Sequence, residues 1–276
     1  MFLSIFIFNG GGYMDKRFLT PGEVANAIVN VNAKRGDLKT TPCILLGIMA
    51  GIFIGLGGLG NILVTQTLGN IDAGLARLAG AAVFPVGLMF VVMCGAELFT
   101  GNNLMTLAVA QKKTTMAKMF RNWGISYIAN FIGALLLVVV LYYGGTIGGD
   151  AVTKSIGIAE AKANLTFTQA FFRAIPCNMI VVLAVWMATA AQDVVSKIFA
   201  CWFPIMLFVL CGFEHSVANM FFIPMGMVLG ADVTIAQLIG NLVPVTLGNI
   251  VGGAIFIPFM YYMAYLKISP TEKIKG

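Results

Sequence analysis

The stretch CGAELFTGN at residues 94–102 recurs in altered form as CGFEHSVAN at residues 211–219. Cysteine, glycine, glutamate and asparagine hold the same places in both copies, 117 residues apart. Each copy lies inside a long apolar segment, where these residues interrupt the hydrophobic sequence. Irregular backbone is tolerated at membrane depth only where it lines a cavity or is buried in protein. The two copies therefore predict two broken helices.

The composition places these segments in a membrane. Of 276 residues, 59% are hydrophobic and 10% are charged, whereas a soluble domain carries about 25% charged residues. This excludes an ordinary soluble enzyme and a disordered chain, and we interpret the net charge of +6 as membrane topology rather than as a nucleic-acid footprint. The five cysteines lie in apolar stretches without metal-ligand spacing, so we expect buried thiols, no metal and no cofactor.

Six segments are long enough to cross a bilayer, which takes about 20 apolar residues. The second and fifth segments are too long for one simple helix, and they contain the two repeated stretches. We place the six at roughly 41–66, 78–110, 120–144, 168–191, 198–229 and 238–266.

The repeat extends to the third and sixth segments. It divides the chain into halves of three segments each, about residues 39–145 and 165–267, and an odd number forces the second half to insert upside down. Inverted repeats are typical of membrane transport folds. The pairs that carry this extension stand 119 residues apart: Asn122 with Asn241, Asn130 with Asn249, and Gly133 with Gly252.

Loop charges indicate the orientation, because cytoplasmic loops are enriched in lysine and arginine. One side has thirteen such residues, whereas the other has Arg77, Lys154 and Lys162, with Arg173 near its boundary. We therefore expect a multi-pass protein of the cell (inner) membrane with both termini in the cytoplasm. The thirteen are Lys16, Arg17, Lys34, Arg35, Lys39, Lys112, Lys113, Lys118, Arg121, Lys197, Lys267, Lys273 and Lys275.

The two ends of the chain lie outside the repeat. Residues 1–14 contain an apolar run too short to span a bilayer and without the features of a signal peptide, so we treat them as a leader without function and Met14 as a candidate start. Residues 15–38 predict a cytoplasmic amphipathic helix on the membrane surface, with a capping box at Thr20 and Glu23. Residues 268–276 are expected to form a cytoplasmic tail.

The sequence at four places resembles the formate/nitrite transporter family. These places are residues 95–102, 183–187, 212–220 and 241–252, and the resemblance covers about residues 16–267. It implies an all-α integral membrane fold with six transmembrane helices, an aquaporin-like inverted repeat and a homopentamer with one pore in each protomer. It also implies that the pore passes small monovalent anions of weak acids, namely hydrosulfide, formate or nitrite. Within the family, the sequence at residues 100–104 is most similar to the hydrosulfide-channel branch.

The resemblance also assigns residues to the pore. It implies that Thr100 and His215 lie at its centre on the two broken helices, with Glu214 supporting the histidine. Lys162 matches a vestibule lysine on the non-cytoplasmic side, and Asn178 faces the same region from the fourth segment. The apolar constrictions that it implies are Phe84, Leu88, Leu98, Phe99 and Phe208.

His215 and Thr100 each have a second interpretation from the residues themselves. His215, the chain's single histidine, would be an ordinary core residue in a soluble protein, but an ionisable group at membrane depth indicates a functional site. It either protonates the anion or only donates a hydrogen bond to it. Thr100 is alternatively a cap for local amides at the helix break. Lys162, expected in a loop, is alternatively a solvated side chain.

Two bare carboxylates beside an anion path would repel the substrate. We therefore expect Glu97 and Glu214 to be structural anchors, hydrogen-bonded to loop amides or to the side chains of Asn102 and Asn219. Glu214 is also placed to orient His215.

Two other functional classes stay open. An aquaporin-like neutral-solute channel normally has paired Asn-Pro-Ala caps, whereas residues 101–103 read Gly-Asn-Asn and residues 217–219 read Val-Ala-Asn. A membrane-embedded enzyme is disfavoured because the chain has one histidine and no set of nucleophile, base and orienting residue.

Overall fold

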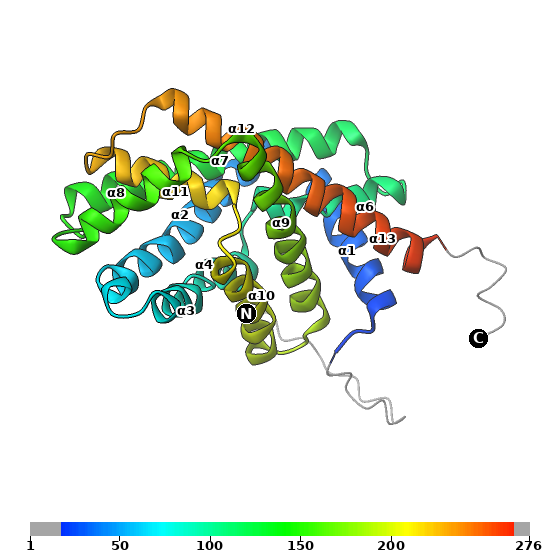
Figure 1. Ribbon diagram of the computed structural model, residues 1–276. Coiled ribbons are helices and arrows are strands. Elements are labelled where there is room, and N and C mark those ends of the chain that lie inside the picture. The colour runs from blue at the N-terminus through cyan, green and yellow to red at the C-terminus, as the bar shows by residue number, and fades with distance from the viewer. Residues whose placement is uncertain (1–17, 268–276) are drawn as a thin grey trace, which may run out of the picture.

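The computed structural model describes residues 18–267, so the expected leader at 1–14 and tail at 268–276 lie outside the described residues. The described part of the chain is almost entirely helical, as predicted (Figure 1). In chain order the helices are α1 (Pro21–Gly36), α2 (Thr40–Thr65), α3 (Ala73–Val83), α4 (Val86–Phe90), α5 (Phe99–Asn102), α6 (Met105–Ala110), α7 (Met116–Tyr143), α8 (Asp150–Ala163), α9 (Phe167–Ala190), α10 (Val194–Leu210), α11 (Ser216–Val228), α12 (Ile235–Ile250) and α13 (Ile257–Tyr261). Short π-helical segments at Val91–Gly95, Val251–Phe256 and Tyr262–Leu266 continue α4, α12 and α13.

Within residues 18–267, five helical stretches are long and apolar enough to cross a membrane. The remaining crossing is divided between α10 and α11, which have 17 and 13 residues and are individually too short. This arrangement agrees with six crossings. The five long stretches are Thr40–Thr65, Ala73–Gly95, Met116–Tyr143, Phe167–Ala190 and Ile235–Leu266.

Both predicted helix breaks are confirmed. The first lies between the π-helical turn that ends at Gly95 and the start of α5 at Phe99. The second lies between the end of α10 at Leu210 and the start of α11 at Ser216. Gly95 and Gly212 have φ angles of +82° and +69°, a left-handed conformation that glycine adopts without steric cost. This requirement explains why glycine occupies the second position of both repeated stretches.

The long helices approach closely where glycines face a neighbouring backbone. A Cβ atom on Gly133 of α7 would fall on the carbonyl group of Ile48 in α2. In the second half, a Cβ on Gly252 would fall on the carbonyl group of Ile175 in α9. Small residues let transmembrane helices pack at short distance, so the repeated glycines fix the same helix crossing in each half.

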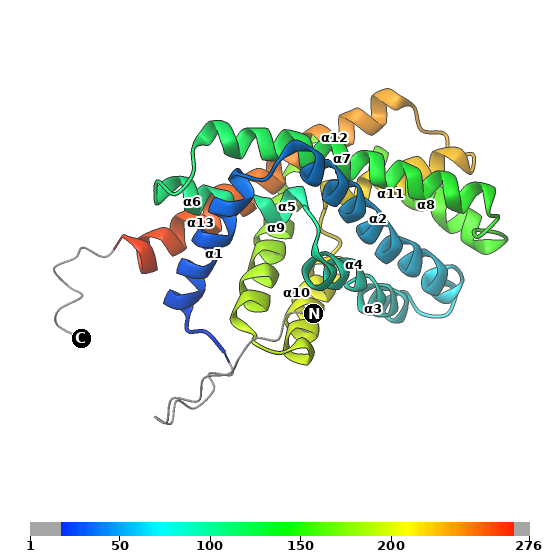
Figure 2. The same ribbon diagram turned by 180° about the vertical axis from the view of Figure 1, so that it is seen from behind.

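The two ends of the molecule are built differently. In both views α1, α6 and α13 gather at one end, and α8 and α11 lie at the other (Figures 1 and 2).

The N-terminal helix α1 packs against the rest of the protein. Val24 and Ile28 of α1 belong to one buried cluster with Leu104, Leu107 and Trp186. The apolar face of α1 therefore contacts protein, where the sequence suggested the membrane surface.

Two smaller expectations have different outcomes. The capping box is present, because the Glu23 carboxylate accepts bonds from the backbone N–H and the hydroxyl of Thr20, each at 2.9 Å. The expectation of five buried thiols is wrong for Cys94 and Cys211, which are exposed. Each lies next to the glycine of a helix break, where the backbone leaves the packed helix and opens the thiol to a cavity or the surface.

We expect Gly133→Ala to lower the melting temperature of the purified protein in detergent by several degrees. The added methyl group must displace the Ile48 carbonyl, and overpacking of this kind typically costs about 1–3 kcal/mol. Gly124→Ala in the same helix is the matched control, because a Cβ there meets no atom within 4 Å. Equal melting temperatures for the two variants would contradict close packing at this crossing.

Candidate functional site

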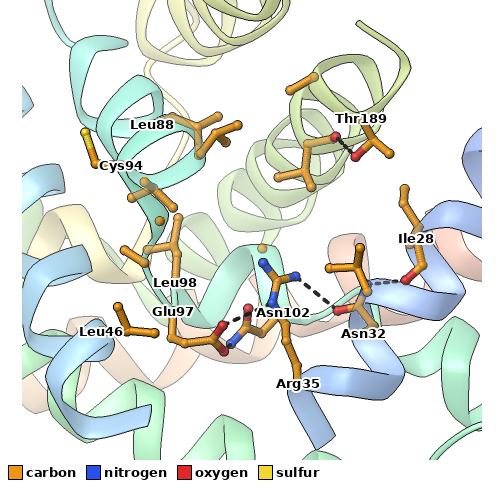
Figure 3. A pocket seen from close by; sticks show the side chains of 18 of the residues that line it. Ile28, Asn32, Arg35, Leu46, Leu88, Cys94, Glu97, Leu98, Asn102 and Thr189 are labelled. Carbon is orange, nitrogen blue, oxygen red and sulfur yellow. Dashed lines mark hydrogen bonds and ion pairs between the residues drawn. The ribbon is translucent and has the colours of Figure 1, made fainter. Parts of the chain in front are cut away.

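Three cavities follow one another through the interior of the protein. The largest, about 630 Å³, is lined by residues of α1, the first helix break and α9 (Figure 3), and we call it the α1-side vestibule. A cavity of about 200 Å³ lies beside Lys162, Glu214 and His215, and we call it the α8-side vestibule. A small chamber of about 10 Å³ lies between them.

The chamber is an apolar constriction that joins the two vestibules. Its volume is at the lower limit of what is needed to hold one water molecule. Leu88 and Leu98 line both the chamber and the α1-side vestibule, whereas Phe84, Phe208 and His215 line both the chamber and the α8-side vestibule. The three cavities therefore adjoin one another in series, and we call this series the path. Its narrowest part is lined by Phe84, Leu88, Leu98 and Phe208, which the sequence placed at the constrictions. The chamber is completed by Ile54, Val181 and Ile205.

Phe99, which the resemblance also placed at a constriction, does not line any of the three cavities. Its ring centroid lies 6.0 Å from that of Trp123 and 5.0 Å from that of Tyr127, inside the core. The preceding Leu98 has extended backbone angles, and successive side chains of an extended backbone point to opposite sides. Leu98 therefore faces the path and Phe99 faces α7.

His215 and Thr100 lie opposite each other, as the symmetry predicted. The Nε2 atom of His215 is 2.9 Å from the Thr100 hydroxyl oxygen, and both side chains are buried. His215 also caps α11, because its Nδ1 atom accepts a hydrogen bond of 3.1 Å from the backbone N–H of Ala218. Since Nδ1 accepts, the proton of the neutral ring is on Nε2, which donates to Thr100. The Thr100 hydroxyl hydrogen then has no acceptor among the described residues.

Glu214 is an anchor that accepts three hydrogen bonds from two partners. Its two carboxylate oxygens lie 2.9 and 3.1 Å from the Lys162 ammonium, and one also accepts from the Asn219 amide at 2.6 Å. The expected contact with His215 is absent from the hydrogen bonds of residues 18–267, and Ala218 orients the ring instead. Lys162 is in the last turn of α8 rather than in a loop.

Glu97 is anchored in the same way at the other break. Its carboxylate accepts from the Asn102 amide at 2.7 Å and the Asn122 amide at 3.1 Å, and from Arg35 Nε at 3.1 Å (Figure 3). Arg35 was not among the residues that the sequence placed at the site. The repeat at 117 and 119 residues does not point to it, because Arg35 and Lys162 stand 127 residues apart; their matching contacts with Glu97 and Glu214 identify them as a pair.

Two asparagines hold the breaks in place. Asn130 accepts a bond from the backbone N–H of Phe99 at 3.0 Å, and its amide donates to the carbonyls of Gly47 and Glu97. Asn249 repeats the pattern: it accepts from the backbone N–H of Ser216 at 2.9 Å and donates to the carbonyls of Ala174 and Glu214. The sequence identified these asparagines as a repeated pair without giving them a role.

Asn178 joins the two halves. Its amide nitrogen lies 3.3 Å from the carbonyl of Thr100, 2.8 Å from the side-chain oxygen of Asn103 and 2.8 Å from the carbonyl of Asn249. The residue is fully buried and lines none of the three cavities. It therefore supports the backbone behind Thr100 rather than the path itself.

Basic side chains line both vestibules, which suits the binding of anions. Lys34 and Lys197 line the α1-side vestibule, and within residues 18–267 neither makes a salt bridge. Arg35 and Lys162 are each paired with a glutamate. The glutamates are therefore neutralised, and the α1-side vestibule keeps an excess of positive charge.

Comparison with known proteins gives one consistent family. The model of the formate/nitrite transporter family matches residues 22–263. The probable formate transporter of Methanothermobacter thermautotrophicus is 42% identical over 273 residues, which covers 92% of this chain and all of that protein. The formate channel FocA of Escherichia coli (strain K12) is 33% identical, covering 90% of this chain and 95% of the relative.

Solved structures agree with these relatives. A pentameric formate channel with formate bound superimposes with a TM-score of 0.77 at 35% identity, covering 83% of this chain and 98% of that chain. An ion channel described as a member of the FNT family gives a TM-score of 0.80 at 29% identity, covering 87% of this chain and 98% of that chain.

We expect Asn249→Asp to destabilise the protein, because a carboxylate has the same shape but no N–H groups for the carbonyls of Ala174 and Glu214. Leaving buried acceptors unpaired costs about 1–3 kcal/mol. The measurement is thermal unfolding in detergent, and Asn70→Asp, an exposed site, is the matched control. A variant as stable as this control would show that Asn249 does not hold the second break.

Proposed function

The chain belongs to the formate/nitrite transporter family, and from this premise we propose that it is a formate channel with one pore in each protomer of a homopentamer. Formate is favoured over nitrite and hydrosulfide because several relatives are named for formate, including BtFdhC of Bacillus thuringiensis at 38% identity. The pentamer is favoured because a solved formate channel of 35% identity is pentameric. The charge distribution supports an inner-membrane location with the α1-side vestibule open to the cytoplasm.

The observation that carries this proposal is the succession of three cavities that share lining residues. An anion can enter from either vestibule, and the vestibules meet at a chamber lined by Leu88, Leu98 and Phe208. A chamber with room for about one water molecule requires the anion to lose most of its hydration shell. Such dehydration costs several kcal/mol or more unless polar groups compensate.

His215 supplies that compensation in our proposal. Its ring lines the chamber and the α8-side vestibule, whereas Thr100 lines none of the three cavities and contacts Nε2 of the ring. An anion beside the ring can replace Thr100 as the acceptor of the Nε2–H and so recover one hydrogen bond for the water it has lost. Lys34 and Lys197, the cations of the α1-side vestibule that make no salt bridge within residues 18–267, raise the local anion concentration before this step.

We propose that His215 acts as a hydrogen-bond donor rather than a proton donor. A doubly protonated ring carries N–H groups on both nitrogens, but Nδ1 already faces the N–H of Ala218. Protonation would therefore place two donors against each other and break the cap of α11. The neutral ring can redirect its single N–H, on Nε2, from the Thr100 hydroxyl to the anion without disturbing the cap of α11.

We expect the reconstituted full chain to pass formate in proteoliposomes, with nitrite and hydrosulfide compared in parallel. Glycerol should fail to produce swelling, because the path narrows to an apolar chamber without the matched polar caps of a neutral-solute channel. Glycerol permeation without formate flux would instead establish the aquaporin-like alternative.

We expect His215→Asn to keep formate flux within about threefold of the original and to leave its pH profile unchanged, because asparagine can still cap α11 and donate to Thr100. His215→Leu, which has neither group, should lower the flux by at least about tenfold. Flux measured from pH 5 to 8 decides the question. A pH profile that changes in His215→Asn would assign proton transfer to the histidine.

A further inference from the structure

We infer that Asn61 binds the anion in the α8-side vestibule and favours oxyanions such as formate and nitrite over hydrosulfide, an inference that rests on the proposed function. Asn61 lies near the end of α2 and lines this vestibule together with Lys162, Phe84 and His215. The residue is partly buried. It was not among the candidate residues from the sequence.

The side-chain amide of Asn61 makes no hydrogen bond to residues 18–267. Its backbone carbonyl accepts a hydrogen bond from the Thr65 hydroxyl at 2.7 Å, but neither N–H of its side chain has an acceptor in that part of the chain. Within this membrane-embedded bundle most buried amides are fully used, as Asn130 and Asn249 show. An amide left open toward a cavity is available to water or to a ligand.

Packing against α3 leaves room for this amide. A Cβ atom on Gly80 would lie 2.5 Å from the amide nitrogen of Asn61 and 2.8 Å from a methyl carbon of Thr65. The absence of a side chain at Gly80 therefore permits the observed position of the Asn61 amide. The position depends on two helices and is not that of a freely rotating surface residue.

Lys162 alone is a weak anion site. Two of its three N–H donors are directed to the Glu214 carboxylate, which also cancels its charge, and the ammonium lies 5.7 Å from the centroid of the Phe222 ring. One N–H remains for an anion. The Asn61 amide adds uncharged hydrogen-bond donors to the α8-side vestibule. These can bind an anion although the net charge of Lys162 and Glu214 is zero.

Such donors distinguish oxyanions from hydrosulfide. Formate and nitrite each present two oxygen acceptors, which can receive one bond from Asn61 and one from Lys162. Hydrosulfide presents one sulfur atom, and sulfur is a weak hydrogen-bond acceptor. The Asn61 contribution is therefore expected to be large for the oxyanions and small for hydrosulfide.

Comparison of the two halves of the repeat shows that the asparagine amide is present in only one of the two vestibules. The position 127 residues after Asn61 is Ala188, which lines the α1-side vestibule. The α1-side vestibule relies on charge, through Lys34 and Lys197, whereas the α8-side vestibule has an open amide. The two mouths of the path thus recognise the anion by different means.

The test uses the full chain in proteoliposomes, with flux measured against concentration for formate, nitrite and hydrosulfide. Asn61→Ala should raise the half-saturating concentration of formate and nitrite about three- to tenfold, as expected for loss of one hydrogen bond of ordinary net strength in a hydrated vestibule, and change that of hydrosulfide less than about twofold. Gln66→Ala is the matched control, because it removes an exposed amide at the C-cap of the same helix, outside the three cavities. The control should leave all three anions unchanged.

Gly80→Ala is the second variant, because its methyl group displaces the Asn61 amide without removing it. It should shift formate and nitrite in the same direction by a smaller factor. Equal changes for all three anions, or none, in the two variants would overturn the inference. An original chain that passes no formate would overturn the proposed function instead, so the two failures are distinct.

Discussion

Backbone amides cannot be left without hydrogen bonds in the interior of a bilayer, and each broken helix exposes several of them. Asn130 and Asn249 resolve this conflict at the two breaks. Each accepts from the first amide of the second half-helix and donates to one carbonyl of the break and one of a neighbouring span. One side chain therefore satisfies the irregular backbone and fastens it to another helix. Without these bonds the interruption in the middle of the membrane would be too costly to keep.

The same constraint explains the buried charges. Glu97 and Glu214 accept from the asparagines that follow them in the short half-helices, and each also binds a cation from the helix preceding a half of the repeat. A buried ion pair is tolerated when further hydrogen bonds satisfy its remaining lone pairs. The result is two ion pairs beside the path, each with no net charge. An anion in the chamber therefore meets hydrogen-bond donors rather than the full charge of a carboxylate.

Much of this architecture could be predicted because the two halves share side chains at fixed spacing. The 117- and 119-residue offsets located the breaks and the supporting asparagines. Arg35 was missed because α1 and the first span match the second half at an offset of 127 residues rather than 117 or 119. This offset becomes visible only when Arg35 and Lys162 are seen to bind Glu97 and Glu214. Phe99 was misplaced because the direction of its side chain depends on the extended backbone at Leu98, which a residue pattern does not give. The contacts of a side chain were thus harder to predict than the helix or helix break in which it lies.

The two halves match in their scaffold and differ in the residues that face the path. At the 117-residue offset His215 corresponds to Leu98, and Thr100 corresponds to Val217. The central polar contact therefore takes its ring from one half and its hydroxyl from the other, while the matching positions are apolar. A strictly symmetric path would have two histidines or none. With one ring, the polar contact faces the α8-side vestibule through His215, whereas Leu98 keeps the other approach apolar. In the proposed function the anion therefore meets one polar contact with an apolar approach on the α1 side, an arrangement that limits how strongly the anion is held.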